Sequence, residues 1–314
     1  MLSTLLTTAF AVGLLQATLR TATPLLLAGI GELFSERSGV LNIGLEGIML
    51  IGSLFGFLVA NQTGSLWLGI AAGGAAGVLI ALIHAVLSVS FGVSQVVSGV
   101  GINILCIGIS MTTYRSVFGM ASSGVPTAPA QEPIFIPWLS DIPIIGEIFF
   151  QQLPLVYVAL LLVPITWFIF YRTELGLKIR SVGEHPLASE TLGVNVYSIR
   201  YMAVMICGLL TGIAGTFLSL GLLNIFLDNM TAGRGWIALA VVIFGKWKPF
   251  GVLWASLLFG LASAFQLRVQ TAGFDIPYQF LLMVPYVLTM LALIGAVGRS
   301  AAPAALAVPF LKDK

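Results

Sequence analysis

Nine long apolar segments dominate this chain and restrict the kinds of fold it can adopt. A helix needs about 20 apolar residues to cross the roughly 30 Å hydrocarbon core of a bilayer. Charged residues make up 8% of the chain, against about 25% in a typical water-soluble domain. The segments lie at approximately 8–32, 40–60, 66–91, 97–118, 153–171, 198–221, 235–246, 249–270 and 276–297. We therefore predict an all-α polytopic membrane protein with about nine hydrophobic segments, between eight and ten, in a single transmembrane domain over residues 1–314.

The seventh segment, 235–246, is too short to cross a membrane alone. A helix from Trp236 to Gly245 would be about 15 Å long. It is either half-inserted or extended by the polar residues on both sides. Broken or half-length helices occur at membrane depth only where protein or a water-filled cavity satisfies the freed backbone groups. We expect such helices near a translocation path.

Lysine and arginine residues are distributed unevenly between the predicted loops, and this distribution predicts the orientation of the chain. With alternating spans, one side holds Arg115, Arg234 and Arg268. The other holds Arg37, Arg172, Lys178, Arg180, Arg200, Lys246, Lys248, Arg299, Lys312 and Lys314. The second side is predicted to be cytoplasmic, which puts the N-terminus outside and the C-terminus inside. The proline-rich loop 119–152, without lysine or arginine, is then external and irregular. The Ala/Pro-rich tail 298–314 is predicted to be cytoplasmic and poorly ordered.

Residues 172–200 form a long polar stretch between two apolar segments. Within it, Pro186 suits the first position of a helix, and Gly193 suits the position just after its end, where positive φ is needed. We predict a short surface helix over 186–192. Such a helix either docks a soluble partner or lies on the lipid headgroups.

The glycine-rich stretch 38–52 contains two polar residues, Asn42 and Glu46, four positions apart. One interpretation is a broken helix that lines the translocation path, with both side chains on one face. The alternative is close helix packing permitted by the glycines, with Asn42 capping the second span and Glu46 near its positive N-terminus.

Other polar residues lie within or beside apolar segments and have similar alternatives. Gln95 and Asn103 occupy a second glycine-rich stretch. Asn224 and Trp236 lie near the outer end of the short segment, in either an external vestibule or an ordinary loop. His84 is more typical of hydrogen-bonded structure than of a proton relay. The candidate pathway residues are Asn42, Glu46, Gln95, Asn103, Asn224 and Trp236.

Four charged residues of the first segment are predicted to be structural. Arg20 lies within the span and is expected to face the bundle or to extend toward the outer headgroups. Glu32, Glu36 and Arg37 lie at its inner end, where we expect a solvated interfacial cluster.

Several kinds of chemistry have no signature in this sequence. There is no GxxxxGK[ST] phosphate-binding loop, and no GxSxG, HExxH or CxxC motif. Cys106 and Cys207 both lie in apolar runs and are interpreted as small core residues. We therefore predict a protein that is not an enzyme, with no cofactor, no metal site and no nucleic-acid partner.

Four motifs identify a family. They are ERSGVLNIGLEGIMLIGSL, FGVSQVVSGVGINIL, RSVGEHPLASETLGVNVYSIRY and GRGWIALAVVIFGKWKPFG. In this order they resemble the permease subunits of bacterial ABC importers for simple sugars and branched-chain amino acids, particularly the nucleoside branch. The resemblance covers about residues 20–297.

The resemblance implies an inner-membrane permease that forms a pseudo-twofold unit with a second, related permease. It implies a cytoplasmic ATPase subunit and an extracytoplasmic substrate-binding lipoprotein as further partners. Residues 172–200 would then be the cytoplasmic coupling loop. The implied ATPase-coupling residues are Glu184, His185, Pro186, Ala188, Glu190, Thr191 and Gly193.

The substrate and the energy source have alternatives at this stage. The simple-sugar permeases have an extra N-terminal span and an Asp-Leu-Ser segment where this chain has LNIGLEG, which favours nucleosides over sugars. Riboflavin importers use very similar permeases. An ion-coupled carrier would need paired titratable residues at the midplane, for which only Arg20, Glu46 and His84 are candidates.

Overall fold

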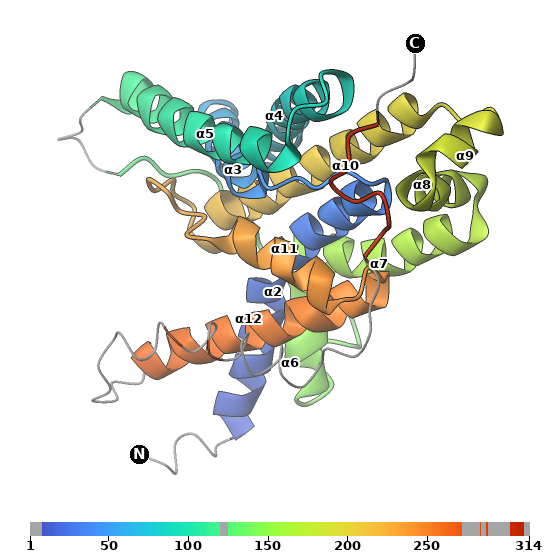
Figure 1. Cartoon of the computed structure of the whole chain (residues 1–314). Coiled ribbons are helices and arrows are strands. Elements are labelled where there is room, and N and C mark those ends of the chain that lie inside the picture. The colour runs from blue at the N-terminus through green and yellow to red at the C-terminus, as the bar shows by residue number, and fades with distance from the viewer. Residues whose placement is uncertain (1–7, 120–124, 272–282, 284–286, 288–301, 311–314) are drawn as a thin grey trace.

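The protein is a bundle of helices with one small pair of strands (Figure 1). The computed structural model describes residues 8–119, 125–271, 283, 287 and 302–310. The elements are α2 (Thr8–Arg37), α3 (Leu45–Thr63), α4 (Leu66–Ala85), η1 (Val86–Ser90), α5 (Gln95–Phe118), β1 (Ile134–Phe135), α6 (Ile145–Phe149), β2 (Gln151–Gln152), α7 (Pro154–Arg172), α8 (Glu174–Glu184), α9 (Pro186–Thr191), α10 (Val196–Thr216), η2 (Phe217–Leu222), α11 (Arg234–Phe244) and α12 (Pro249–Thr271). The segments η1 and η2 are π-helical and continue α4 and α10.

Within the described residues, seven helices are long and apolar enough to span a membrane. Each coincides with one of the predicted segments, and the predicted short segment is the 11-residue helix α11. These matches confirm the all-helical membrane class and the presence of a half-length helix. The predicted segment 276–297 lies outside the described residues.

Glycines allow the central helices α3, α4 and α10 to approach each other at backbone distance. A Cβ atom on Gly52 of α3 would overlap the backbone of Gly212 on α10. A Cβ atom on Gly212 would in turn overlap the carbonyl of Gly73 on α4. Gly77 and Gly208 meet in the same way one turn farther along. We call these five residues the glycine seam. It confirms the close packing expected of Gly52 and draws three spans into one tight unit.

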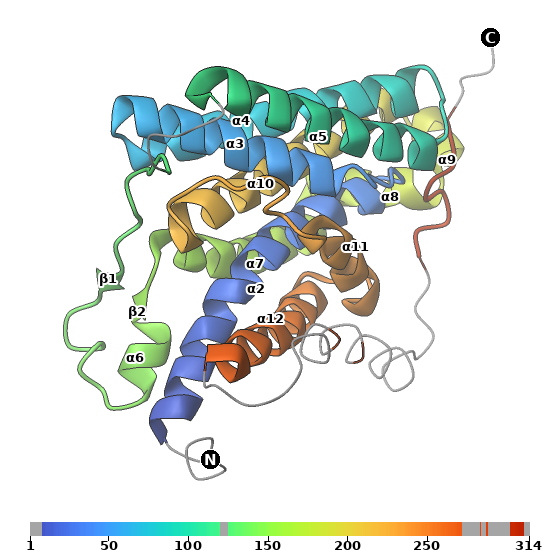
Figure 2. The same ribbon diagram turned by 90° about the vertical axis from the view of Figure 1, so that its left-hand side faces the viewer.

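The predicted external loop contains more regular structure than expected. Strands β1 and β2 pair antiparallel, with Ile134 opposite Gln152, and α6 lies between them in sequence. The loop predicted to be irregular thus contains two short strands and one short helix, with irregular chain between them. Arg20 of α2 donates from Nε to Oε1 of Gln152 at 3.1 Å, so its side chain bonds to this loop. Figure 2 shows β1, β2 and α6 at one end of the molecule, with α8 and α9 at the opposite end.

The tail was predicted to be poorly ordered, and residues 302–310 contradict this prediction. Phe310 is buried, and Ala305 donates from its backbone nitrogen to the carbonyl of Gly183 at 2.9 Å. This segment is the dark red trace beside α8 and α10 in Figure 1. Its backbone donors find acceptors on folded elements, and its one large ring is buried. These contacts fix a segment that composition alone marks as flexible.

Candidate coupling and translocation elements

The chain between α2 and α3, residues 38–44, is a non-helical break inside the apolar region. Asn42 donates from its backbone nitrogen to Oε1 of Glu32 at 2.8 Å, and its Oδ1 accepts from the nitrogen of Gly44 at 3.0 Å. The other oxygen of Glu32 accepts from Sγ of Cys207 at 3.2 Å. Because α3 begins at Leu45, Asn42 does not share a helical face with Glu46 as the first interpretation required.

Two side chains from α5 satisfy more of the backbone at this break. Gln95 accepts from the nitrogen of Leu41 at 2.7 Å. Asn103 accepts from the nitrogen of Gly47 at 2.8 Å and donates to the carbonyl of Ile43 at 3.0 Å. Freed backbone groups at membrane depth need such partners. Gln95 and Asn103 are both buried, and these bonds hold the start of α3 against α5.

His84 of α4 fixes the same break from the other side. Its Nε2 lies 3.2 Å from the carbonyl oxygen of Leu41, and its Nδ1 lies 3.1 Å from Oγ of Ser98. A carbonyl only accepts, so Nε2 carries the proton and donates. The imidazole is fully buried. The expected hydrogen-bonded structural role of His84 is confirmed.

Glu46 binds the N-terminus of the half-length helix α11. Its Oε1 accepts from the nitrogen of Gly233 at 2.7 Å, and its Oε2 accepts from the nitrogen of Gly235 at 2.6 Å. Only 7% of Glu46 is exposed. A carboxylate here satisfies free N–H groups and opposes the positive end of the helix dipole. Glu46 therefore does lie at a positive helix end, but that helix is α11 as well as its own.

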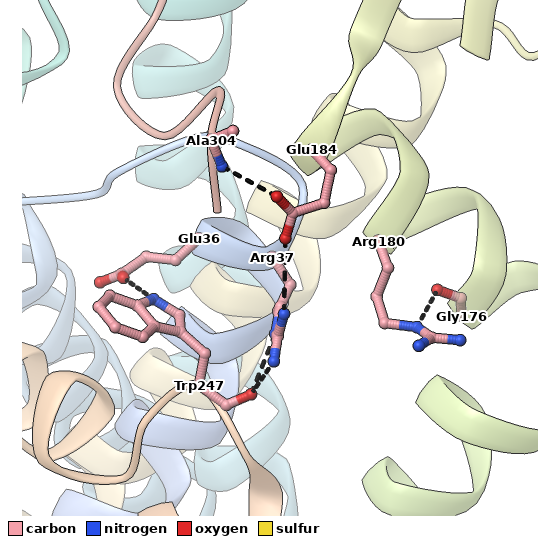
Figure 3. A network of polar contacts seen from close by, with 7 residues as sticks. All are labelled: Glu36, Arg37, Gly176, Arg180, Glu184, Trp247 and Ala304. Carbon is pink, nitrogen blue, oxygen red and sulfur yellow. Dashed lines mark hydrogen bonds and ion pairs between the residues drawn. The ribbon is translucent and has the colours of Figure 1, made fainter. Parts of the chain in front are cut away.

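The other end of α11 is held by residues from the C-terminal end of α2. Trp247 donates from its indole nitrogen to Oε2 of Glu36 at 2.5 Å. Its carbonyl accepts from Nε and Nη2 of Arg37 at 3.0 and 2.7 Å. Figure 3 shows Arg37 between Trp247 and Glu184.

The predicted solvated cluster at the end of α2 is wrong for its two acids. Glu32 and Glu36 are almost completely buried, at 0% and 1% exposure. The break and the turn after α11 fold over this end of α2 and exclude water from it. Their backbone and indole N–H groups take the place of solvent as donors. The burial of these acids could not be read from the local sequence, because Trp247 and Glu36 are 211 residues apart.

Residues 174–191 form two short helices at the end of the molecule opposite the strands (Figure 2). Oγ1 of Thr173 accepts from the nitrogen of Gly176 at 3.2 Å and caps α8. Pro186 begins α9, and Gly193 follows it with φ of +84°. The predicted short helix is confirmed as α9. The helix α8 was missed, although the Thr173 cap before an amphipathic stretch is a readable signal.

The surface of α9 is apolar and largely open. Leu187 and Leu192 expose 65% and 84% of their surface. At the junction of α8 and α9, Oε1 of Glu184 lies 4.0 Å from Nη1 of Arg37, and Ile179 and Val182 of α8 are buried. Exposed leucines on a capped helix fit a groove in another protein better than they fit bulk water.

The two remaining candidate residues have different positions. Trp236, in the first turn of α11, is 47% exposed. Asn224 has φ of +57°, and its carbonyl accepts from the nitrogen of Ala128 in the loop 119–152. Asn42, Glu46, Gln95 and Asn103 thus gather around residues 38–47, whereas Asn224 belongs to the opposite end.

The sequence analysis also missed an exposed stripe on α5. Val97 and Ile104 are 65% and 68% exposed, and a Cβ atom on Gly101 or Gly108 would meet no neighbouring atom. These positions repeat at seven-residue spacing, so they share one helix face. The periodic glycines are the signal that could have identified this face.

Comparison with known proteins shows that this chain is similar to membrane transport proteins. Residues 14–294 match the family described as branched-chain amino acid transport system / permease component. The guanosine ABC transporter permease protein NupQ of Bacillus subtilis is 44% identical over 96% of this chain and 97% of its own. The putative glucose ABC transporter permease protein TsgC13 of Haloferax volcanii is 47% identical over 83% of this chain and 79% of its own. The nucleoside ABC transporter permease protein NupC of Lactococcus lactis is 37% identical over 93% and 95%. No solved structure matches the chain.

Proposed function

This chain belongs to the permease-component family of branched-chain amino acid transport systems, and from that premise we propose that it is the membrane subunit of an ATP-driven nucleoside importer. It is a multi-pass protein of the cytoplasmic membrane. ATP hydrolysis takes place on a separate subunit. A substrate-binding protein delivers the solute from outside.

The observation that carries the proposal is α9. It is a capped helix with exposed leucines, at the end opposite the external loop. In the proposed complex, a groove of the ATPase subunit takes up Leu187 and Leu192. Movement of the ATPase then displaces α8 and α9. The displacement is passed to the end of α2 and the turn after α11, where Arg37 lies between Glu184 and Trp247.

We propose that α11 and the break at 38–44 form the moving part of the gate. Both ends of α11 are hydrogen-bonded to side chains from α2 and α3. The helix also meets α3 at backbone distance at one position, where a Cβ atom on Gly235 would overlap the backbone of Glu46. The glycine seam joins α3, α4 and α10 at backbone distance at several positions. In this proposal α11 shifts while the glycine seam stays intact.

A second permease subunit covers the exposed stripe on α5 in the proposed complex. Val97 and Ile104 with Gly101 and Gly108 then line the path between the two subunits. The finer topology also belongs to this proposal: about nine spans, with the N-terminus outside. The basic residues of 172–200 and the acidic, lysine-free loop 119–152 support this orientation.

Nucleosides are the proposed substrates because NupQ and NupC, similar over nearly their full lengths, carry guanosine and nucleoside in their names. A sugar is the second candidate, since TsgC13 is at least as similar over a shorter range. Uptake of radiolabelled guanosine by proteoliposomes containing the full importer distinguishes these. Competition by glucose but not by unlabelled inosine would overturn the nucleoside proposal.

The coupling assignment has its own test. Gly193→Pro, or deletion of 184–192, should abolish uptake while leaving membrane insertion intact, because proline cannot adopt the positive φ after α9. Gly64→Pro is the matched control, since Gly64 also follows a helix with positive φ, of +69°, but lies at the end of α3. Wild-type uptake by the deletion variant would contradict the assignment.

A further inference from the structure

Residues 302–310 contact the end of α8, the chain that follows α2 and the first turns of α10. Ala304 donates from its backbone nitrogen to Oε2 of Glu184 at 3.2 Å. Ala305 donates to the carbonyl of Gly183 at 2.9 Å, and Ala307 donates to the carbonyl of Gly39 at 3.1 Å. One short stretch is thus hydrogen-bonded both to the end of α8 and to the chain that follows α2. Figure 3 shows Ala304 beside Glu184 at this junction.

The same stretch is fastened to the first turns of α10. Nη1 of Arg200 donates to the carbonyl of Val308 at 3.1 Å, and the Tyr197 hydroxyl donates to the carbonyl of Phe310 at 3.2 Å. The Phe310 ring lies edge-on to Tyr197 at 5.6 Å and 6.0 Å from the Arg200 guanidinium carbon. Residues three apart on a helix share a face, so Tyr197 and Arg200 hold Phe310 between them.

The local chain is shaped for this attachment. Gly39 has φ of +92°, and a Cβ atom there would lie 2.9 Å from Nη2 of Arg200 and 3.1 Å from the Ala305 carbonyl oxygen. Arg200 is 1% exposed, and within the part of the chain that the structure describes its Nε and Nη2 have no hydrogen-bond partner. Its acceptor on Val308 is therefore its single hydrogen-bond partner among the described residues. A buried guanidinium that depends on one carbonyl makes that carbonyl structurally important.

We propose that residues 302–310 form a C-terminal clasp that ties the end of α8 to the chain after α2 and to the first turns of α10, so that a displacement of α8 and α9 reaches the break at 38–44. The direct polar link between α8 and α2 is the Arg37–Glu184 pair at 4.0 Å, in which the glutamate side chain is 44% exposed. Ion pairs with an exposed partner contribute little to the free energy that holds two elements together. Backbone groups of the clasp instead form hydrogen bonds with the end of α8, with Gly39 after α2 and with two side chains of α10, and the clasp adds a buried aromatic ring. This inference rests on the proposed coupling role of α9.

The test is hydrogen–deuterium exchange on the assembled importer in lipid nanodiscs, with the ATPase trapped by vanadate or left nucleotide-free. We follow peptides covering 38–47 and 186–192. In the wild-type complex, trapping should change exchange in both regions. Deleting 302–314 should leave the change at 186–192 and reduce the change at 38–47 by about fivefold or more, as expected from losing several hydrogen bonds. Deleting 312–314, which keeps the clasp, should behave as wild type.

Two point variants keep the test decisive if the longer deletion fails to assemble. Phe310→Ala removes the ring, and Tyr197→Phe removes only the hydroxyl donor. Both should reduce the trapping-dependent change in exchange at 38–47, and Phe310→Ala should reduce it more. The ATPase subunit should still copurify with both variants. A wild-type change in exchange at 38–47 in Phe310→Ala or in the 302–314 deletion would overturn the clasp proposal. No protection of 186–192 in the wild-type complex would instead overturn the coupling role of α9, and the clasp with it.

Discussion

Replacing Glu46 with glutamine tests whether its carboxylate holds the half-length helix α11 in place. Both oxygens of Glu46 accept backbone N–H groups at the start of α11, from Gly233 and Gly235. Glutamine keeps one acceptor but presents an amide donor to the other N–H. Losing one hydrogen bond to a buried charge costs about 1.5–3 kcal/mol, and losing the charge at a helix N-terminus costs about 0.3–2 kcal/mol.

Together these terms predict a loss of about 2–5 kcal/mol for Glu46→Gln. The loss for Glu46→Ala should be larger, because both acceptors disappear. We expect a fall in the apparent melting temperature of the purified complex in detergent, compared at one scan rate because membrane proteins often unfold irreversibly. Guanosine uptake should fall in parallel.

Two comparisons make the result interpretable. Glu147→Gln is the matched control, since Glu147 is also an acid in the first turn of a short helix but is solvent-exposed; surface changes of this kind stay within about 0.5 kcal/mol. Glu36→Ala should affect transport less than Glu46→Ala, because Glu36 accepts one hydrogen bond from Trp247. If Glu46→Gln melted and transported as the wild type does, the carboxylate would not anchor α11.

Three further predictions concern packing and the inner end of α2. Gly212→Ala should destabilise by about 1–3 kcal/mol because its Cβ overlaps the backbone of α4, whereas Gly101→Ala, with open space around it, should not; thermal melting of the two variants compares them directly. His84→Phe should lose about 1–3 kcal/mol by leaving a buried carbonyl without its donor, measured in the same way, and an unchanged melt would contradict the structural role. Glu184→Gln should change the free energy of unfolding by less than about 1 kcal/mol, because its ion pair with Arg37 is long and exposed. Arg37→Met should destabilise the protein more, because two hydrogen bonds to the Trp247 carbonyl are lost.

The elements recovered from sequence are those with a local cause. Runs of about 20 apolar residues identified the spans, and a short run between polar residues identified α11. Pro186 and Gly193 delimited α9 because their backbone preferences act at single positions. Each of these signals is contained within one segment, so it can be read without knowing what the segment packs against.

The parts that sequence did not predict depend on contacts between distant segments. Glu32 and Glu36 look like an interfacial cluster because acids at a helix end are usually solvated. They are buried because the break and the turn after α11 fold over them. Phe310 is the one large apolar ring among residues 302–310, and its site exists only once Tyr197 and Arg200 are placed by α10.

The glycine seam also limits where new transport specificities can arise. Any side chain larger than hydrogen at 52, 73, 77, 208 or 212 would push two backbones apart. A randomised library aimed at a different solute would therefore waste most clones that alter these positions. Positions 97, 101, 104 and 108 are open within this chain and, in the proposed complex, line the path between the two permease subunits, so diversity placed there would leave the fold of this chain intact.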